Sequence, residues 1–178
     1  MTECCTPRPR QSEQRCAPEA QAAQQPVARP AKASCPASGD PGKPVEPITL
    51  EHLLTAQARM RLLDAPYYFC RGRSCDVVYF TASAESTFTK ADLTVPVTQK
   101  DPGDSVPVCY CFGHTRASIY DEIRRTGTST VVADITHRVQ AGECACERTN
   151  PQGSCCLGNV SQAVKHGLAF FTTVAATR

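Results

Sequence analysis

The sequence lacks the patterns that mark several large classes of protein. It has no apolar stretch approaching the roughly 18 residues of a membrane-spanning helix, and its first residues, Met1–Cys5, lead into no apolar segment like that of a secretory signal peptide. The net charge is only +2, without the basic cluster or aromatic-and-arginine stripe typical of nucleic-acid-binding proteins. We therefore expect a cytoplasmic protein with neither a nucleic-acid nor a membrane partner.

Common catalytic motifs are missing as well. The sequence contains no glycine-rich phosphate-binding loop, no nucleophile elbow and no HExxH motif. These absences argue against a hydrolase or a transferase. Large apolar side chains are also almost absent from residues 1–34, which are rich in proline, alanine and glutamine. Such a segment cannot bury enough apolar surface to offset its ordering entropy, so we predict a disordered tail there.

Cysteine, in contrast, is abundant, with 12 among 178 residues. Half of these cysteines lie in one window, 109–156, as three close pairs: Cys109 and Cys111, Cys144 and Cys146, Cys155 and Cys156. Thiols so close in sequence rarely bridge to each other but converge readily on a metal. In a reducing cytosol, clustered thiols hold metal or do redox work more often than they form disulfides. We therefore predict a metalloprotein.

The first half of the globular region combines one helical pattern with strands. Residues 49–63 carry apolar side chains near helical spacing, with Thr49 as a candidate N-cap; a strand of a zinc-ribbon-like sheet is the alternative. Aromatic and β-branched runs on either side of a glycine-containing turn predict a β-hairpin over 67–80. Residues 88–97 can add a strand, and 101–104 form a linker to the second half.

The second half predicts three short helices. The first begins at His114 or Thr115 and ends at Thr126, the second runs from Ser129 or Thr130 to Gly142, and the third runs over 157–167. Each cysteine pair falls just before or at a helix start. Backbone N–H groups at a helix start stabilise negative charge and lower thiol pKa values, so these positions favour thiolates.

The spacing of the cysteines suits an iron–sulfur cluster. A 2Fe–2S cluster needs four thiolates, two on each iron. Cys109 and Cys111 supply two from one turn, and the helical stretch 112–143 brings a second cysteine group back to them. Segments 112–115 and 156–159 are placed to donate amides to the sulfurs. The window therefore predicts a 2Fe–2S site.

Motifs across nearly the whole globular region resemble a known family. They are Tyr67-Tyr-Phe-Cys70 followed by Cys75-x-Val-Val-Tyr-Phe80, Pro107-Val-Cys-Tyr-Cys111, and Asn150-Pro-x-Gly-x-Cys155-Cys156. Together they resemble the N-terminal domain of the copper chaperone CopZ, which carries one 2Fe–2S cluster and one mononuclear zinc. The cluster part is also similar to bacterioferritin-associated ferredoxin and to the central part of the NifU scaffold.

The resemblance implies that four of the six window cysteines hold the cluster: Cys109, Cys111, Cys146 and Cys156. The family places one ligand before the Asn-Pro-x-Gly loop and one at its end, which selects Cys146 and Cys156. Cys144 fits the simple ferredoxin spacing and is the alternative to Cys146. Cys155 would then be a packed or spare thiol.

The resemblance also implies a zinc site, with one departure. The family pairs a Cys-Pro-x-Cys turn with two hairpin cysteines, giving the Cys₄ tetrahedron of structural zinc. Here Cys35, Cys70 and Cys75 match three of these ligands, but Ser38 stands at the fourth. Candidates for the vacant position are Asp40, His52, water, and the tail cysteines Cys4, Cys5 and Cys16. The alternative is that Ser38 abolishes the zinc site and leaves free thiols.

We therefore expect an α+β fold. A small β-hairpin, zinc-ribbon-like subdomain over 35–104 would precede a three-helix, bacterioferritin-associated-ferredoxin-like 2Fe–2S subdomain over 105–178. The resemblance implies one-electron transfer linked to copper or other soft-metal handling, with a redox partner protein or a metal ion as partner. Reduction of Cu(II) is the reaction it suggests, in an electron-transfer protein rather than a classical enzyme. The alternative is a non-redox thiol buffer for metals or an iron–sulfur cluster carrier.

The resemblance also has a limit. In the copper chaperone this domain is joined to a heavy-metal-associated domain with a Met-x-Cys-x-x-Cys loop, and no such loop occurs in this sequence.

Overall fold

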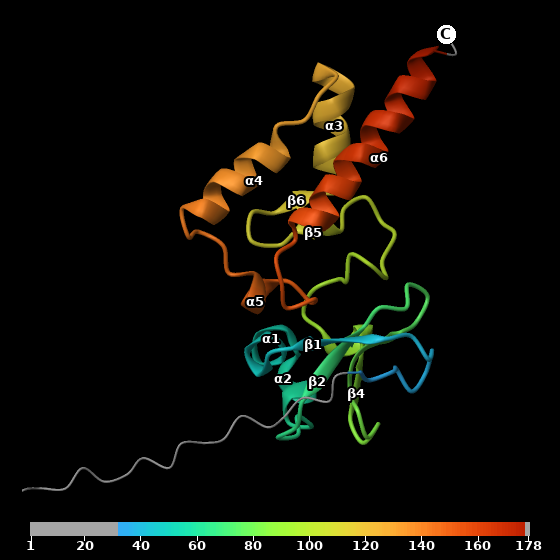
Figure 1. The fold of residues 1–178 in the computed structure, drawn as a ribbon, viewed down its shortest axis with the longest axis vertical. Helices are drawn as coiled ribbons and strands as arrows, with labels where there is room; N and C mark the ends of the chain where they lie inside the picture. The colour runs from blue at the N-terminus through green and yellow to red at the C-terminus, as the bar shows by residue number, and fades with distance from the viewer. Residues whose placement is uncertain (1–31, 177–178) are drawn as a thin grey trace, which may run out of the picture.

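A computed structural model of the chain describes residues 32–176. In this part a four-stranded antiparallel sheet with two short helices lies at one end of the molecule, and a group of longer helices lies at the other (Figure 1). The predicted tail lies outside the described residues, apart from 32–34. Within the described part, no helix is long and apolar enough to cross a bilayer.

The sheet has strands in sequence order, each antiparallel to the next: β1 (Gly42–Val45), β2 (Tyr67–Cys70), β3 (Val77–Thr81) and β4 (Thr87–Thr89). The predicted hairpin is confirmed as β2 and β3, with Tyr68 opposite Phe80. The predicted strand over 88–97 is mostly wrong. After Thr89 the chain enters a 3₁₀ turn, η1 (Lys90–Asp92), because the Asp92 carboxylate accepts the Thr89 amide at 2.8 Å and caps that turn.

The helix predicted over 49–63 is two helices, α1 (Pro47–Leu53) and α2 (Ala56–Arg59). Pro47 at the first turn favours an earlier start, because its fixed φ suits a helix and it has no amide to satisfy. The break falls where Leu54 forms a β-bridge to Leu93 and the Thr55 hydroxyl caps α2. Thr49 is therefore not an N-cap; it is buried inside α1.

Both faces of the central strands are covered, since every residue of β2 and β3 is buried. One face packs against α1 and α2 through Phe69, Tyr79 and Phe88. On the other face, Tyr68 and Phe80 pack with the buried Cys35 and Cys70. The second face therefore holds cysteines within an aromatic core.

All three predicted helices of the second half are present, as α3 (Arg116–Thr126), α4 (Val131–Gln140) and α6 (Leu157–Ala176). Thr115 caps α3 in a capping box, and Gly127 ends it with a φ of 76°. Ahead of α3 lies a short ribbon of β5 (Pro107–Cys109) and β6 (His114–Thr115). A short helix, α5 (Cys146–Thr149), was not predicted.

The predicted end of the third helix at Gly167 is wrong, because α6 continues to Ala176. Gly167 is instead a point of close helix contact. A Cβ there would lie 2.7 Å from Tyr120 Cδ1 and 2.8 Å from Ile123 Cδ1, both on α3. The glycine thus serves packing of α6 on α3 rather than helix termination.

Helix α5 and the loop that joins it to α6 connect the two ends of the molecule. The Thr49 hydroxyl donates to the Glu147 carbonyl at 2.6 Å, and the buried Tyr79 hydroxyl donates to the Pro151 carbonyl at 2.8 Å. Gly153 has a φ of 60°, and a Cβ on it would lie 2.9 Å from Thr49 Oγ1. The sheet end therefore holds the segment between Cys146 and Cys156 in place.

Candidate metal centres

Three cysteines meet at the sheet end. Cys35 precedes an exposed turn, Cys70 ends β2, and Cys75 lies in the connection to β3. Their sulfurs all lie within 4.8 Å of one another, and Cys35 Sγ is 3.8 Å from Cys75 Sγ. Cys35 and Cys70 are buried, whereas Cys75 is half-buried. The structure thus brings together the three residues that the sequence predicted as zinc ligands.

The fourth corner of this group is occupied by Ser38. Its Oγ lies 3.6 Å from Cys70 Sγ and also bonds Cys35. Tetrahedral zinc, at about 2.3 Å from sulfur and about 2.1 Å from oxygen, places two sulfurs about 3.8 Å apart and a sulfur and an oxygen about 3.6 Å apart. The distances of 3.8 Å from Cys35 Sγ to Cys75 Sγ and 3.6 Å from Ser38 Oγ to Cys70 Sγ agree with these values. Three thiols and one hydroxyl therefore fit a zinc ion.

The other predicted fourth ligands are less well placed. Asp40 and His52 do not belong to the group of ligand atoms within 4.8 Å of one another. The His52 ring instead bonds the Ile48 carbonyl through Nδ1 at 2.9 Å. Cys4, Cys5 and Cys16 lie outside the described residues.

Positive charge lies close to the three sulfurs. Lys100 is buried, and its Nζ donates to the carbonyls of Gly72 at 2.6 Å and Cys75 at 3.1 Å. Burial raises the pKa of the Cys70 thiol, against hydrogen bonds from Ser38 and the Gly72 amide and the charge of Lys100. At Cys35, burial is outweighed by the Ser38 hydroxyl and nearby amides, so its pKa is lowered.

The four cysteines that the resemblance selected for the cluster also come together, at the junction of the two ends. Cys109 ends β5, Cys146 begins α5, and Cys156 directly precedes α6. Cys111 Sγ lies 3.6 Å from Cys146 Sγ. The Cys156 thiol bonds the sulfurs of both Cys109 and Cys146. Neighbouring sulfurs thus follow the order 109, 156, 146, 111.

This quartet is more extended than the sheet-end group. Within residues 32–176, no three of its sulfurs all lie within 4.8 Å of one another. A single tetrahedral ion needs all of its sulfurs at about 3.8 Å spacing, whereas a 2Fe–2S core takes two thiolates at each end. The four sulfurs are therefore spread more widely than a single zinc ion requires.

Amide donors surround the quartet. The amides of Phe112 and Cys111 bond Cys109, the Ala145 amide lies 3.4 Å from Cys111 Sγ, and the Cys156 amide bonds Cys146. Two of these donors, at 112 and 156, come from segments predicted to supply them. Such donors stabilise thiolates and an anionic cluster alike.

Hydrogen bonds among the clustered thiols shift their pKa values in opposite directions. The bond from Cys156 lowers the pKa of Cys109 to about 7 and that of Cys146 to about 5. The same bonds, first to Cys109 and then to Cys146, raise the pKa of Cys156, while burial raises that of Cys111. The thiolate, which is the form that binds metal ions, is therefore favoured at Cys109 and Cys146.

The two remaining window cysteines lie at the margin. Cys155 is exposed. Cys144 is half-buried; burial and the neighbouring Cys146 raise its pKa. The Cys144 thiol accepts a hydrogen bond from the Cys146 amide, whereas the Cys146 thiol bonds the sulfurs of Cys111 and Cys156. Cys146 therefore lies within the row of bonded sulfurs.

Comparison with known proteins points to one family. Residues 32–94 match the CopZ-type zinc-binding domain. The chain is 31% identical over 123 residues to the copper chaperone CopZ of Archaeoglobus fulgidus, an alignment that covers 68% of this chain and 57% of that protein. It also superposes on the X-ray structure of the N-terminal domain of that CopZ with a TM-score of 0.61 and 30% identity, covering 72% of this chain and 95% of the domain.

The chain belongs to the CopZ N-terminal-domain family. The zinc-binding match spans the whole sheet end of this CopZ-type chain, including Cys35, Cys70 and Cys75. Because the chain spans little more than half of the curated CopZ, that protein's activity as a whole does not transfer with the family.

Two residues of this CopZ-type chain were not predicted from its sequence. The Thr149 hydroxyl lies 3.1 Å from Cys111 Sγ, on a short helix that has no periodic signal. Lys100 reaches the zinc-site loop across 25 residues or more of sequence. Only the tertiary fold places either side chain, so no spacing rule could have found them.

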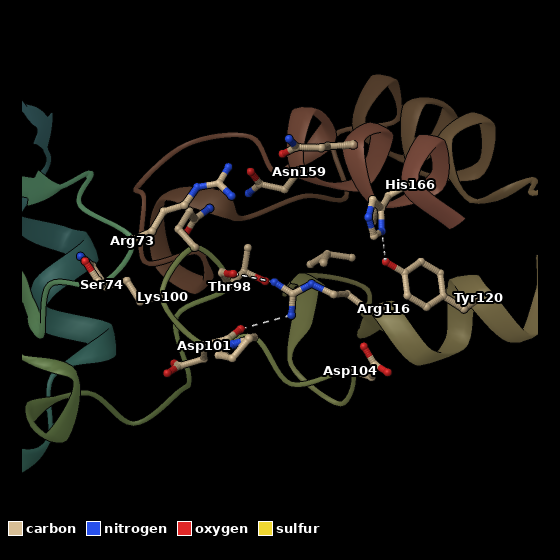
Figure 2. A pocket seen from close by; sticks show the side chains of 15 residues that line it. Arg73, Ser74, Thr98, Lys100, Asp101, Asp104, Arg116, Tyr120, Asn159 and His166 are labelled. Atoms are coloured by element: carbon tan, nitrogen blue, oxygen red, sulfur yellow. Dashed lines mark hydrogen bonds between the residues drawn. The ribbon is translucent and has the colours of Figure 1, made fainter. Parts of the chain in front are cut away.

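A cavity of about 670 Å³ lies between the two ends of the molecule. Figure 2 shows Arg73, Asn159 and Arg116 around it, with Arg116 bonded to Thr98 and Asp101. None of the described cysteines lines this cavity. It is therefore separate from both thiol groups, and Arg116 serves to fix the linker before α3.

Proposed function

We propose that this chain is a cytoplasmic electron-transfer protein that binds one 2Fe–2S cluster and one zinc ion and acts in the handling of copper or another soft metal. The meeting of four thiols at the junction supports the cluster most directly. The ligands would be Cys109, Cys111, Cys146 and Cys156 for the cluster, and Cys35, Cys70 and Cys75 for zinc.

The cluster, when bound, supplies the chemistry of gaining and losing one electron. The protein's residues position it and set its potential. Cys109, Cys146 and Cys156 are nearly inaccessible, with exposed fractions of 0%, 5% and 2%. Cys111 is only half-buried, so the sulfurs on that side are nearest the surface. That side is where a redox partner or a metal ion would approach.

The link to metals comes from the family. The homologue is named a copper chaperone, and the matching domain is a zinc-binding domain. For the residues described here, we propose electron delivery to a metal ion, through the one-electron chemistry of the cluster. Reduction of Cu(II) to Cu(I) consumes the one electron that a redox partner protein would supply.

A second candidate, a cluster carrier or thiol metal buffer, is favoured by the spare thiols. Cys155 is exposed and directly precedes Cys156, and Cys144 is two residues from Cys146. Spare thiolates beside ligands can begin ligand exchange. A cluster that moves quickly to an apo-acceptor would favour this candidate.

Metal analysis of anaerobically purified protein tests the proposal. We expect red-brown protein with two irons and one zinc per chain. Cys146→Ser should lose iron and keep zinc, whereas Cys144→Ser and Cys155→Ser, the matched controls, should keep both. Cys70→Ser should lose zinc and keep iron. Colourless protein would contradict the cluster, and loss of iron in Cys144→Ser but not in Cys146→Ser would overturn the ligand assignment.

A further inference from the structure

The fourth corner of the sheet-end thiol group faces solvent. Cys35 and Cys70 have exposed fractions of only 2% and 0%, whereas Ser38 and the rest of its turn, residues 36–39, are exposed. The three sulfurs are thus held by the core while the oxygen stands on the surface.

Ser38 is also weakly held there. In this structure its hydroxyl contacts two thiols and accepts the Asp40 amide at a long 3.4 Å. A neutral hydroxyl is a poorer ligand than a thiolate for zinc and for softer ions. Structural zinc sites are closed by four strong ligands, and sites that react keep an exchangeable position. A Cys₃ group with a surface serine belongs to the second type.

We propose that Ser38 is a displaceable fourth ligand and that an external thiolate takes its place, which makes this group a metal-exchange site rather than a closed structural one. The incoming thiolate forms one metal–sulfur bond as the metal–oxygen bond to Ser38 breaks, and the hydroxyl keeps its proton. This inference rests on the zinc half of the proposed function and is independent of the cluster.

Cations outnumber anions around this corner. Lys100 donates to the Gly72 and Cys75 carbonyls, and Arg71 and Arg73 stand exposed in the same turn, against the one carboxylate of Asp40 beside Gly72. A fourth thiolate adds one negative charge to the three already present, and these cations offset it. The thiolate can come from a small thiol or from a cysteine of a metal-exchanging protein.

The test uses the full chain with its cluster, with zinc replaced by one equivalent of cadmium as an NMR probe. We expect a resonance typical of three sulfurs and one oxygen that moves to the four-sulfur position when glutathione is added. Ser38→Cys, the matched control, should show the four-sulfur resonance from the start and should not respond. Ser38→Ala should respond as the wild type does, because water then fills the corner.

Release of zinc to a chelator gives a second readout, and should be faster in the wild type than in Ser38→Cys on the order of 10-fold. A response to an equimolar Cys-x-x-Cys peptide identifies a protein cysteine as the ligand, and a response only to excess glutathione identifies a small thiol. A four-sulfur resonance in the wild type without added thiol would overturn the inference. If that resonance disappears when Cys4, Cys5 and Cys16 are all replaced with serine, one of these three cysteines is the fourth ligand.

Two results would separate this inference from the zinc proposal beneath it. Metal bound by Ser38→Cys but not by the wild type would show that Ser38 abolishes the site, which overturns the inference. Metal bound by neither protein would overturn the inference and the zinc half of the proposed function together, while leaving the cluster untouched.

Discussion

At the scale of single residues, the donors beside each sulfur decide how a thiol site behaves. Cys111 has two such donors, the Ala145 amide at 3.4 Å and the Thr149 hydroxyl at 3.1 Å. The same hydroxyl lies 3.0 Å from the Ala145 carbonyl, to which it donates when Cys111 carries its proton. When Cys111 is a thiolate, the hydroxyl can turn to donate to sulfur.

Replacing this hydroxyl should change the reduction potential of the cluster. A hydrogen bond to a ligand sulfur stabilises the reduced, more negative state. Thr149→Val should therefore lower the potential by tens of millivolts, since a bond worth about 1 kcal/mol corresponds to about 40 mV for one electron. Thr149→Ser keeps the hydroxyl and should match the wild type. Redox titration followed by visible absorption measures both, and equal potentials in all three proteins would refute the role of Thr149.

At the scale of elements, α3 supplies the cap that α4 lacks. Thr130, the N-cap residue of α4, makes no capping bond with its own side chain. Instead the Glu122 carboxylate accepts the Thr130 amide at 3.0 Å and the hydroxyls of Ser129 and Thr130. The Thr130 amide, opposed by partial burial and aided by both hydroxyls, lowers the pKa of Glu122.

Removing this cap should destabilise the protein in a pH-dependent way. Glu122→Ala should lower the free energy of unfolding by about 1 kcal/mol at neutral pH. Because the folded-state pKa is lowered, the stabilisation is complete above the ordinary glutamate pKa and disappears as the pH falls through the lowered value. Urea unfolding of the two proteins at neutral and acidic pH measures this. A difference that stays constant with pH would refute the assignment.

Alanine substitutions at two glycines of α6 distinguish the effect of helix packing on stability from the effect of helix propensity. Gly167→Ala places a Cβ against Tyr120 and Ile123 and should destabilise the protein by about 1–3 kcal/mol. Gly158→Ala, in the same helix, meets nothing within 4 Å and should be neutral or stabilising by up to about 1 kcal/mol. Thermal unfolding of both variants tests the contact. Equal stability would show that α6 and α3 are less closely packed than described.

At the scale of the whole molecule, the sheet end supports the cysteine quartet through the loop after α5. Tyr79 has an exposed fraction of 0% and donates to the Pro151 carbonyl. Tyr79→Phe leaves that carbonyl without its donor and should cost about 1–3 kcal/mol. We also expect faster loss of iron to a chelator, because the loop carries Cys156. Tyr67→Phe, which removes a buried hydroxyl bonded to Ser86 within the sheet end, controls for loss of a hydroxyl away from the loop. Equal iron loss in Tyr79→Phe and the wild type would contradict this support.

Much of this molecule could be predicted from its sequence, because its signals are local. The hairpin at Tyr67 to Thr81 has the turn and the β-branched residues that specify it, and α3 has both caps. The break after Leu53 could not be predicted, since it depends on a bridge to Leu93 far along the chain. Gly167 was read as a helix end because its contact with Tyr120 is tertiary. The preference for Cys146 as a ligand came from the family pattern and stays a prediction, because spacing alone left Cys144 open.

The central claim is that the junction cysteines hold a redox-active 2Fe–2S cluster. Electron paramagnetic resonance of the anaerobic protein, titrated with dithionite, tests it most directly. We predict a silent oxidised state and, on reduction, one unpaired electron per chain while the visible absorption bleaches. The signal should be lost in Cys146→Ser and kept in Cys155→Ser. Colourless protein that carries only zinc and gives no signal on reduction would contradict the account.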